Sequence, residues 1–162
     1  MRITPTLFAL LGLAVLPTAA DAAPPKLPLD YFAGQWACSG HFANGRPIAA
    51  TIAAQWDEVA GTLIVRHDDV AGGGYHAVET WGASVPPGTL RASIVIAGMG
   101  IRWFASPGWG SDTLTWTLAE PGDDVDRFVY TRRSKDAMTV EWGVSKKEGE
   151  FQIGDTLECT RR

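Results

Sequence analysis

The chain has 162 residues, of which 46% are hydrophobic and 20% charged, and its formal net charge at pH 7 is −4. This length fits one domain, and the composition excludes a disordered tail, a collagen-like rod and a small disulfide-dense protein. The acidic balance provides no basic surface for nucleic acid or for anionic lipid. The sequence has 18 glycines and seven tryptophans, and this density of tryptophan predicts either an aromatic core or an aromatic-lined pocket.

Residues 1–22 have the pattern of a signal peptide. An apolar run follows a short positive start, and the small residues Ala20 and Ala22 fit a cleavage site. The run is too short to cross a bilayer, and no later stretch approaches the roughly 20 apolar residues of a spanning helix. We therefore expect a periplasmic or secreted protein without a membrane span; a retained interfacial anchor is the alternative. Residues 23–33 are expected to form an extended, proline-rich leader before a domain at 34–162.

The rest of the chain is typical of short β-strands. Apolar residues alternate with a period of two, turn residues interrupt them every 8–12 residues, and no segment of ten or more residues has helical spacing. The predicted strands cover residues 35–42, 48–56, 62–68, 75–82, 90–97, 101–105, 113–118, 127–133, 138–144 and 150–160. Such a series predicts an up-and-down barrel or a sandwich.

The first two strands test this alternation. Even-numbered positions carry the apolar residues in both strands. A two-residue turn at Asn44 and Gly45 would place the two apolar stripes on opposite faces. We therefore expect a three-residue connection with Gly45 in the left-handed region, Phe42 opposite Ile48, and both stripes facing inward.

The two cysteines lie near the two ends of the predicted domain. In an oxidising compartment they predict a disulfide, Cys38–Cys159, although two buried free thiols are the alternative. If these residues face each other in an antiparallel pair, Trp36 faces Arg161, with the indole beneath the guanidinium. The first and last strands are then neighbours. The predicted fold is therefore all-β, a single up-and-down antiparallel β-barrel of about ten strands closed by pairing of the first strand with the last.

Gly34-x-Trp36 at the start of the first strand, with Arg161 late in the last strand, resembles the calycins, which include the lipocalins. The combination of a signal peptide with this Gly-x-Trp motif and a series of tryptophan-bearing strands is similar to that of bacterial exported lipocalin-like proteins. The resemblance implies a barrel that binds a small molecule in its interior. Some barrel relatives hold haem on a histidine of a late strand, but no histidine follows His76, so we expect no cofactor.

Candidate ligand-binding residues are aromatic, with one arginine. Trp109 follows a glycine in a loop and is expected to act as a lid over the barrel mouth. Tyr130 and Arg132 share one face of a strand and could hold a carboxylate. The remaining candidates are strand tryptophans that are expected to line the interior: Trp56, Trp81, Trp103, Trp116 and Trp142. The alternative interpretation is a packed core without a cavity.

The sequence offers few residues for catalysis or for a metal. His67 opposite His76 would bring two imidazoles together, but we interpret this region as a solvated hairpin end and expect no metal. The sequence has no nucleophile elbow, and bridged cysteines are not nucleophiles. An enzyme that uses Glu79, Tyr130 or Arg132 is a third possibility.

These observations predict an exported, monomeric, non-catalytic protein. Its expected ligand is a small apolar or amphipathic molecule, for example an anionic acyl or aromatic compound, bound in the aromatic interior. The alternative is a protein-binding module, such as an inhibitor of an exported peptidase, that acts through loops on a packed barrel.

Overall fold

The computed structural model describes residues 29–84, 88–122, 125–145 and 150–162; the expected signal peptide and residues 23–28 of the expected leader lie outside these ranges. All ten predicted strands are present, and an eleventh short strand lies between the sixth and the seventh. The strands are β1 (Gly34–Phe42), β2 (Pro47–Asp57), β3 (Thr62–Ala71), β4 (His76–Ala83), β5 (Leu90–Ile96), β6 (Gly100–Ser106), β7 (Trp109–Gly110), β8 (Thr113–Leu118), β9 (Val125–Ser134), β10 (Ala137–Ser145) and β11 (Gln152–Arg161).

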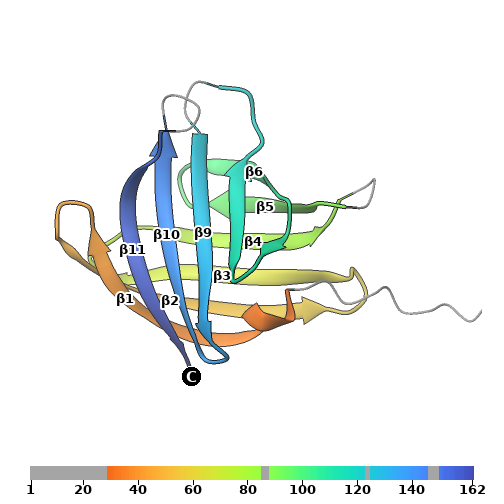
Figure 1. Ribbon diagram of the computed structural model, residues 1–162, viewed down its shortest axis with the longest axis horizontal. Helices are drawn as coiled ribbons and strands as arrows, with labels where there is room; N and C mark the ends of the chain where they lie inside the picture. The colour runs from red at the N-terminus through yellow and green to blue at the C-terminus, as the bar shows by residue number, and fades with distance from the viewer. Residues whose placement is uncertain (1–28, 85–87, 123–124, 146–149) are drawn as a thin grey trace, which may run out of the picture.

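The strands form a closed antiparallel β-barrel. Neighbours in sequence pair with one another, β1 pairs with β11, and β6 pairs with β8, so ten strands complete the ring. The extra strand, β7, lies outside the ring and pairs only with β8 among the described residues. In Figure 1, β9 to β11 run upright in front of β3 to β5, which run nearly horizontally behind them. The predicted barrel is confirmed.

The ladders that close the ring differ in length. The β1–β11 ladder extends from Trp36 opposite Arg161 to Phe42 opposite Asp155. The β6–β8 ladder contains only Phe104 opposite Leu118 and the adjacent pair. The ring is therefore held by a long seam between its terminal strands and by a short seam between β6 and β8.

The disulfide Cys38–Cys159 crosses the long seam, as predicted. The two cysteines face each other in the β1–β11 ladder, with their Cα atoms 4.0 Å apart and 121 positions apart in the sequence. The same register places Trp36 opposite Arg161, and the guanidinium carbon lies 4.2 Å from the centre of the indole. Both predictions from the cysteine pair are therefore confirmed.

The first hairpin has the expected turn but not the expected pairing. Gly45 has a φ of +79°, and the Phe42 N–H donates to the carbonyl oxygen of Arg46 at 2.9 Å. A three-residue connection therefore places Phe42 opposite Arg46, and Ile48 pairs with Gly40. The predicted pairing of Phe42 with Ile48 is wrong by two residues. Because side chains alternate with a period of two, the apolar stripes still face inward.

Residues before β1 seal one end of the barrel, which we call the closed end. Asp30–Phe32 form a 3-10 helix rather than the extended leader expected from the prolines, and Leu29 and Phe32 are fully buried. The Trp36 indole N–H donates to the carbonyl oxygen of Phe32 at 2.9 Å. This helix therefore covers the end of the barrel interior.

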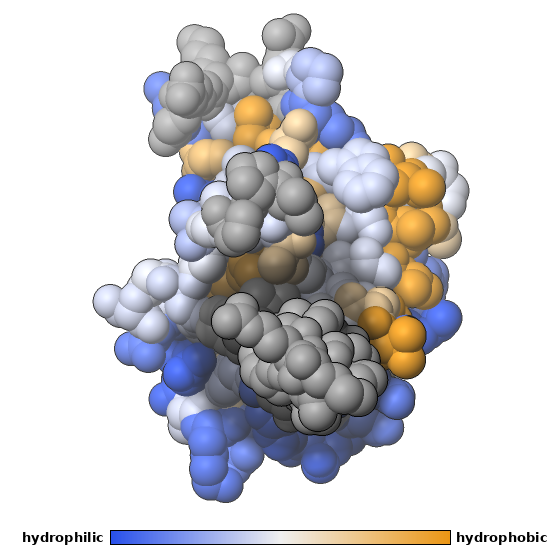
Figure 2. Space-filling model, turned by 90° about the vertical axis from the view of Figure 1, so that its right-hand side faces the viewer, coloured by the Kyte–Doolittle hydropathy of each residue, from blue (hydrophilic) through white to orange (hydrophobic). Residues whose placement is uncertain are grey.

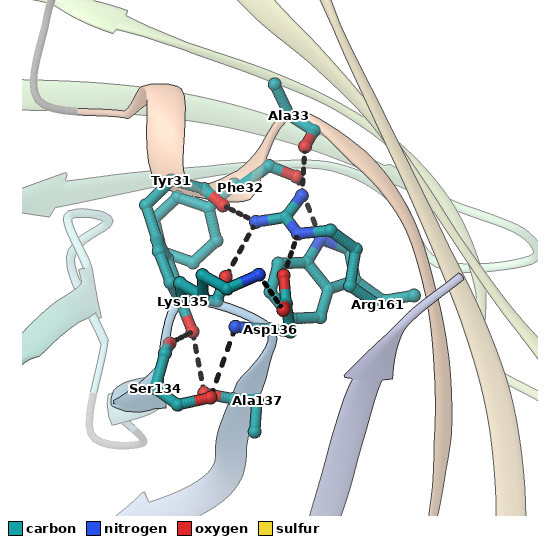
Figure 3. Close-up of polar contacts among 9 residues, drawn as sticks. Tyr31, Phe32, Ala33, Ser134, Lys135, Asp136, Ala137 and Arg161 are labelled. Atoms are coloured by element: carbon teal, nitrogen blue, oxygen red, sulfur yellow. Dashed lines mark hydrogen bonds and ion pairs between the residues drawn. The ribbon is translucent and has the colours of Figure 1, made fainter.

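Arg161 fixes the helix at the closed end (Figure 3). Its guanidinium donates to the carbonyl oxygens of Tyr31, at 2.8 Å, and of Ala33. The same side chain lies 3.4 Å from a carboxylate oxygen of Asp136 in the β9–β10 turn. The Tyr31 hydroxyl donates to the carbonyl oxygen of Ala137 at 2.7 Å. Arg161 thus joins the segment before β1 to the last strand and to the β9–β10 turn.

The core consists of the side chains that point inward from each strand and of those before β1. The largest fully buried side chains include Trp36, Trp81, Trp116, Phe32 and Phe104. Within the described ranges, no helix is both long enough and apolar enough to cross a membrane.

Candidate functional site

The half of the interior near the closed end is tightly packed. Trp81 lies 5.2 Å from Trp116 and 5.3 Å from Tyr130 between ring centres, and Phe32 lies 5.1 Å from Trp81. All four side chains are buried. Three of the expected ligand-binding residues, Trp81, Trp116 and Tyr130, therefore form an aromatic cluster in this half of the barrel.

The other half contains a pocket. We call this end the open end, since the β1–β2, β3–β4 and β5–β6 connections lie there. The pocket has a volume of about 540 Å³. Its lining is Phe42, Arg46, Ile48, His67, Asp69, Gly72, Gly73, Gly74, Tyr75, Ile96, Met99, Arg102, Phe104, Asp126, Phe128, Val140, Trp142, Asp155 and Leu157. Trp142 is the expected ligand-binding residue that lines this pocket.

The remaining expected ligand-binding residues lie elsewhere. Trp109 stacks on Phe32 at 5.5 Å with an interplanar angle of 15°, so it lies at the closed end and does not cover the pocket. The Arg132 guanidinium lies over the rings of Tyr31, at 4.6 Å, and Trp109, at 4.4 Å, also at the closed end. The Trp56 indole N–H donates to an Asp30 carboxylate oxygen at 2.7 Å, beside the same helix. These three residues therefore lie around the 3-10 helix at the closed end and not around the pocket.

Trp103 lies on the outside of the barrel, where 56% of its surface is exposed, so its expected position in the interior is wrong. The register of β5 with β6 explains the difference, because Ile94, which points inward, pairs with Arg102. Residues on β6 that share a face with Arg102 therefore point inward, and Trp103 points outward.

Five aromatic side chains contribute to the lining of the pocket. Phe104 lies 5.5 Å from Phe128 between ring centres, and Phe128 lies 6.4 Å from Tyr75. Trp142 and Phe42 complete this lining. Such a concave surface with a few polar groups is typical of small-molecule sites.

Two carboxylates face the pocket from β3 and β11. Asp69 is buried and accepts a hydrogen bond from the Tyr75 backbone N–H at 2.8 Å. Burial, together with the negative charge of Asp69, raises the pKa of Asp155 to about 6. The sequence indicates this residue, because Asp155 is the acidic exception in the apolar phase of the last strand.

His67 also lines the pocket, and only 6% of its surface is exposed. Burial lowers its pKa to about 4, although Asp69 and Asp68 act in the opposite direction, so the imidazole is neutral at pH 7. The ring contacts Tyr75 edge-on, with 5.0 Å between centres. Its Nε2 atom has no hydrogen-bond partner among the described residues.

The predicted pairing of His67 with His76 is wrong by one residue. His67 pairs with Ala77, and His76 pairs with Asp68. Because side chains alternate across a sheet, His67 points inward and His76 points to solvent, where its Nδ1 lies 3.1 Å from an Asp68 oxygen. In the part of the chain that the structure describes, no group of three His, Cys, Asp or Glu residues is arranged to hold a metal ion.

The two arginines of the pocket have partners. Arg102 forms an ion pair with Asp126, and its Nε atom lies 3.7 Å from Glu120. The Arg46 guanidinium lies 4.3 Å from the centre of the Phe42 ring at the rim. These contacts leave the Asp69 and Asp155 carboxylates without an arginine or lysine partner among the described residues.

Glu79 lies in the interior but does not line the pocket. It is 2% exposed, and one of its carboxylate oxygens accepts a hydrogen bond from the Trp81 indole at 2.7 Å. Burial raises the pKa of Glu79 to about 7, and this hydrogen bond opposes the shift. Burial likewise raises the pKa of Tyr130 well above its usual value. Neither group contacts the pocket, so neither is placed to act on a molecule bound there.

Comparisons with known proteins find little. No protein-family model matches the sequence, and no curated protein sequence matches it significantly. Among solved structures, the chain is similar to a de novo designed fluorescence-activating β-barrel. The two are 15% identical, with a TM-score of 0.40, and the match covers 82% of this chain and 95% of that one.

Proposed function

We propose that this protein binds a small apolar or amphipathic molecule in the pocket at the open end of its barrel, without catalysing a reaction. The observation that carries the proposal is the unfilled volume of about 540 Å³, lined by aromatic side chains. Pockets of roughly 300–1,000 Å³ are typical of small-molecule sites. The tightly packed aromatic cluster and the seal at the closed end leave this volume confined to one half of the barrel.

We further propose that the protein is an exported, calycin-like barrel. The contact of Trp36 with Arg161 supports the likeness, because an arginine over this tryptophan is the feature on which the resemblance depends. The disulfide Cys38–Cys159 is compatible with an oxidising compartment such as the periplasm or the extracellular space.

Tryptophan fluorescence tests the binding proposal. We would titrate the protein with 1-octanol, which does not absorb where tryptophan does, and measure binding in parallel by calorimetry. Trp142 lines the pocket and Trp103 lies outside the barrel. Trp142→Phe should remove the saturable change in emission, whereas the matched control Trp103→Phe should retain it. Absence of saturable binding of 1-octanol and of larger apolar molecules would refute the proposal.

A second candidate function, protein binding, has one observation in its favour. The outer faces of β4, β5 and β6 expose the apolar residues Val78, Val95, Ile101 and Trp103. Val95 pairs directly with both Val78 and Ile101, so these side chains form a continuous patch. Figure 2 shows apolar surface along one side of the molecule. Such patches mark interaction surfaces, and this one lies on strands rather than on loops.

A further inference from the structure

The charges around the pocket are unequal. Both of its arginines have partners. Arg102 forms ion pairs with Asp126 and Glu120, and the Arg46 guanidinium lies over the face of the Phe42 ring. Among the described residues, the donors to the Asp69 and Asp155 carboxylates are the backbone N–H groups of Tyr75 and Trp142, respectively.

Tyr75 lines the pocket beside these carboxylates. After burial, the influences that raise its pKa are the negative charges of Glu79, Asp69, Asp126 and Asp155. Among the described residues, the lining of the pocket holds three aspartates and two arginines, so negative charge is in excess, which is the opposite of what an anionic ligand requires.

His67 adds to the lining of the pocket a second, independent polar group that lacks a partner within the described part of the chain. Its imidazole is neutral at pH 7, it is more than nine-tenths buried, and it lines the pocket. Its Nε2 atom has no hydrogen-bond partner among the described residues. A buried polar atom without a partner costs about 1–3 kcal/mol, so a ligand that supplies the partner gains affinity.

We infer that the ligand of this pocket carries a primary ammonium group on an apolar or aromatic body. This inference rests on the proposed function and names the charge class of its ligand. The ammonium N–H groups donate to the carboxylates of Asp69 and Asp155 and to the Nε2 atom of His67. The body of the ligand contacts the rings of Phe128 and Trp142, which also attract a cation over their faces.

Three probes with one tail distinguish the possibilities: octylammonium, 1-octanol and octanoate, compared by calorimetry at pH 7.5. A charge-assisted hydrogen bond contributes about 1.5–3 kcal/mol, which corresponds to roughly tenfold or more in affinity. We therefore expect octylammonium to bind at least tenfold more tightly than 1-octanol, and octanoate to bind more weakly than both. If 1-octanol or octanoate binds as tightly as octylammonium, the inference fails while the proposed function stands. If none of the three binds, the inference fails, and the proposed function fails with it when larger apolar molecules do not bind either.

Two variants locate the charge. Asp155→Asn and Asp69→Asn should each weaken octylammonium binding roughly tenfold and leave 1-octanol binding within about twofold. Glu158→Gln is the matched control, because Glu158 is an exposed carboxylate on the same strand as Asp155. Circular dichroism checks that each variant folds. If Asp69→Asn does not fold because it weakens the hydrogen bond from the Tyr75 N–H, the result for Asp155→Asn alone tests the inference. Undiminished preference for octylammonium in Asp155→Asn would overturn the inference.

Discussion

Glu79 makes the stability of this protein depend on pH in an unusual direction. In the unfolded chain its carboxyl has the ordinary pKa of 4.5, whereas burial raises the pKa to about 7 in the folded protein. Between these values the folded state holds a proton that the unfolded state has released, so unfolding becomes more favourable as pH rises. The difference of about 2.5 pKa units corresponds to about 3 kcal/mol, lost progressively from pH 4.5 until pH exceeds 7.

The substitution Glu79→Gln removes this titration and keeps the side-chain shape. The glutamine carbonyl can still accept the hydrogen bond from the Trp81 indole, which spans 2.7 Å in the wild type. We expect the free energy of unfolding of the variant, relative to the wild type, to increase by about 3 kcal/mol between pH 4.5 and pH 8. Urea denaturation at four or five pH values measures this difference.

Other groups that titrate in the same interval do not disturb the comparison. His67 has its pKa lowered to about 4, so its contribution to stability is lost as pH falls from 6.5. Asp155 has its pKa raised to about 6, so its contribution is lost as pH rises from 3.8. Both are present in each protein and cancel in the difference. A constant difference between variant and wild type across the whole pH range would refute the reasoning.

Three further predictions concern the β1–β11 seam. Trp36→Ala should cost roughly 3–5 kcal/mol and Arg161→Ala about 1–2 kcal/mol, and denaturation of the double variant should show non-additive effects because the side chains touch. Titration of the denatured protein should find no free thiol, and replacing Cys38 and Cys159 by alanine should cost about 4–5 kcal/mol in the chain-entropy model. Gly40→Ala should lower the free energy of unfolding by about 1–3 kcal/mol or more, because its Cβ would lie 1.8 Å from a backbone oxygen of β11; a loss below 0.5 kcal/mol would contradict this.

The barrel and its closure were predictable because they depend on local alternation and on one covalent constraint. The strands have a period of two and are separated by turn residues. The pairing of Cys38 with Cys159 then determined the register of β1 with β11. A single pair of residues was enough because a strand pair has only one register once two facing residues are known.

Hydropathy did not predict which side chains of β6 point into the barrel. Ile101 and Trp103 are apolar and exposed, whereas Arg102 faces the pocket. The tight turn after β5, in which the Met99 N–H donates to the carbonyl oxygen of Ile96, determines the register and hence the phase. The ion pair with Asp126 then offsets the cost of placing the guanidinium inside.

The pocket could not be predicted because it depends on how side chains from non-adjacent strands share one volume. Trp116 alternates with apolar neighbours just as Trp142 does, yet of these two only Trp142 lines the pocket. The difference arises from their distance along the barrel axis. The local signal was polar: His67, Asp69 and Asp155 occupy inward positions beside apolar residues of β3 and β11.

The unequal lengths of the two seams determine which neighbouring strands of the barrel can separate locally. The disulfide holds β1 to β11 throughout any partial opening, because covalent bonds do not fluctuate open. The β6–β8 seam has two ladder pairs and one further backbone hydrogen bond, from the Ala119 N–H to the carbonyl oxygen of Trp103. One of the pairs contains Phe104, which also lines the pocket. Local opening follows the regions with the fewest hydrogen bonds. Separation of β6 from β8 would therefore give a molecule lateral access to the pocket between two strands while the remaining strands stay paired.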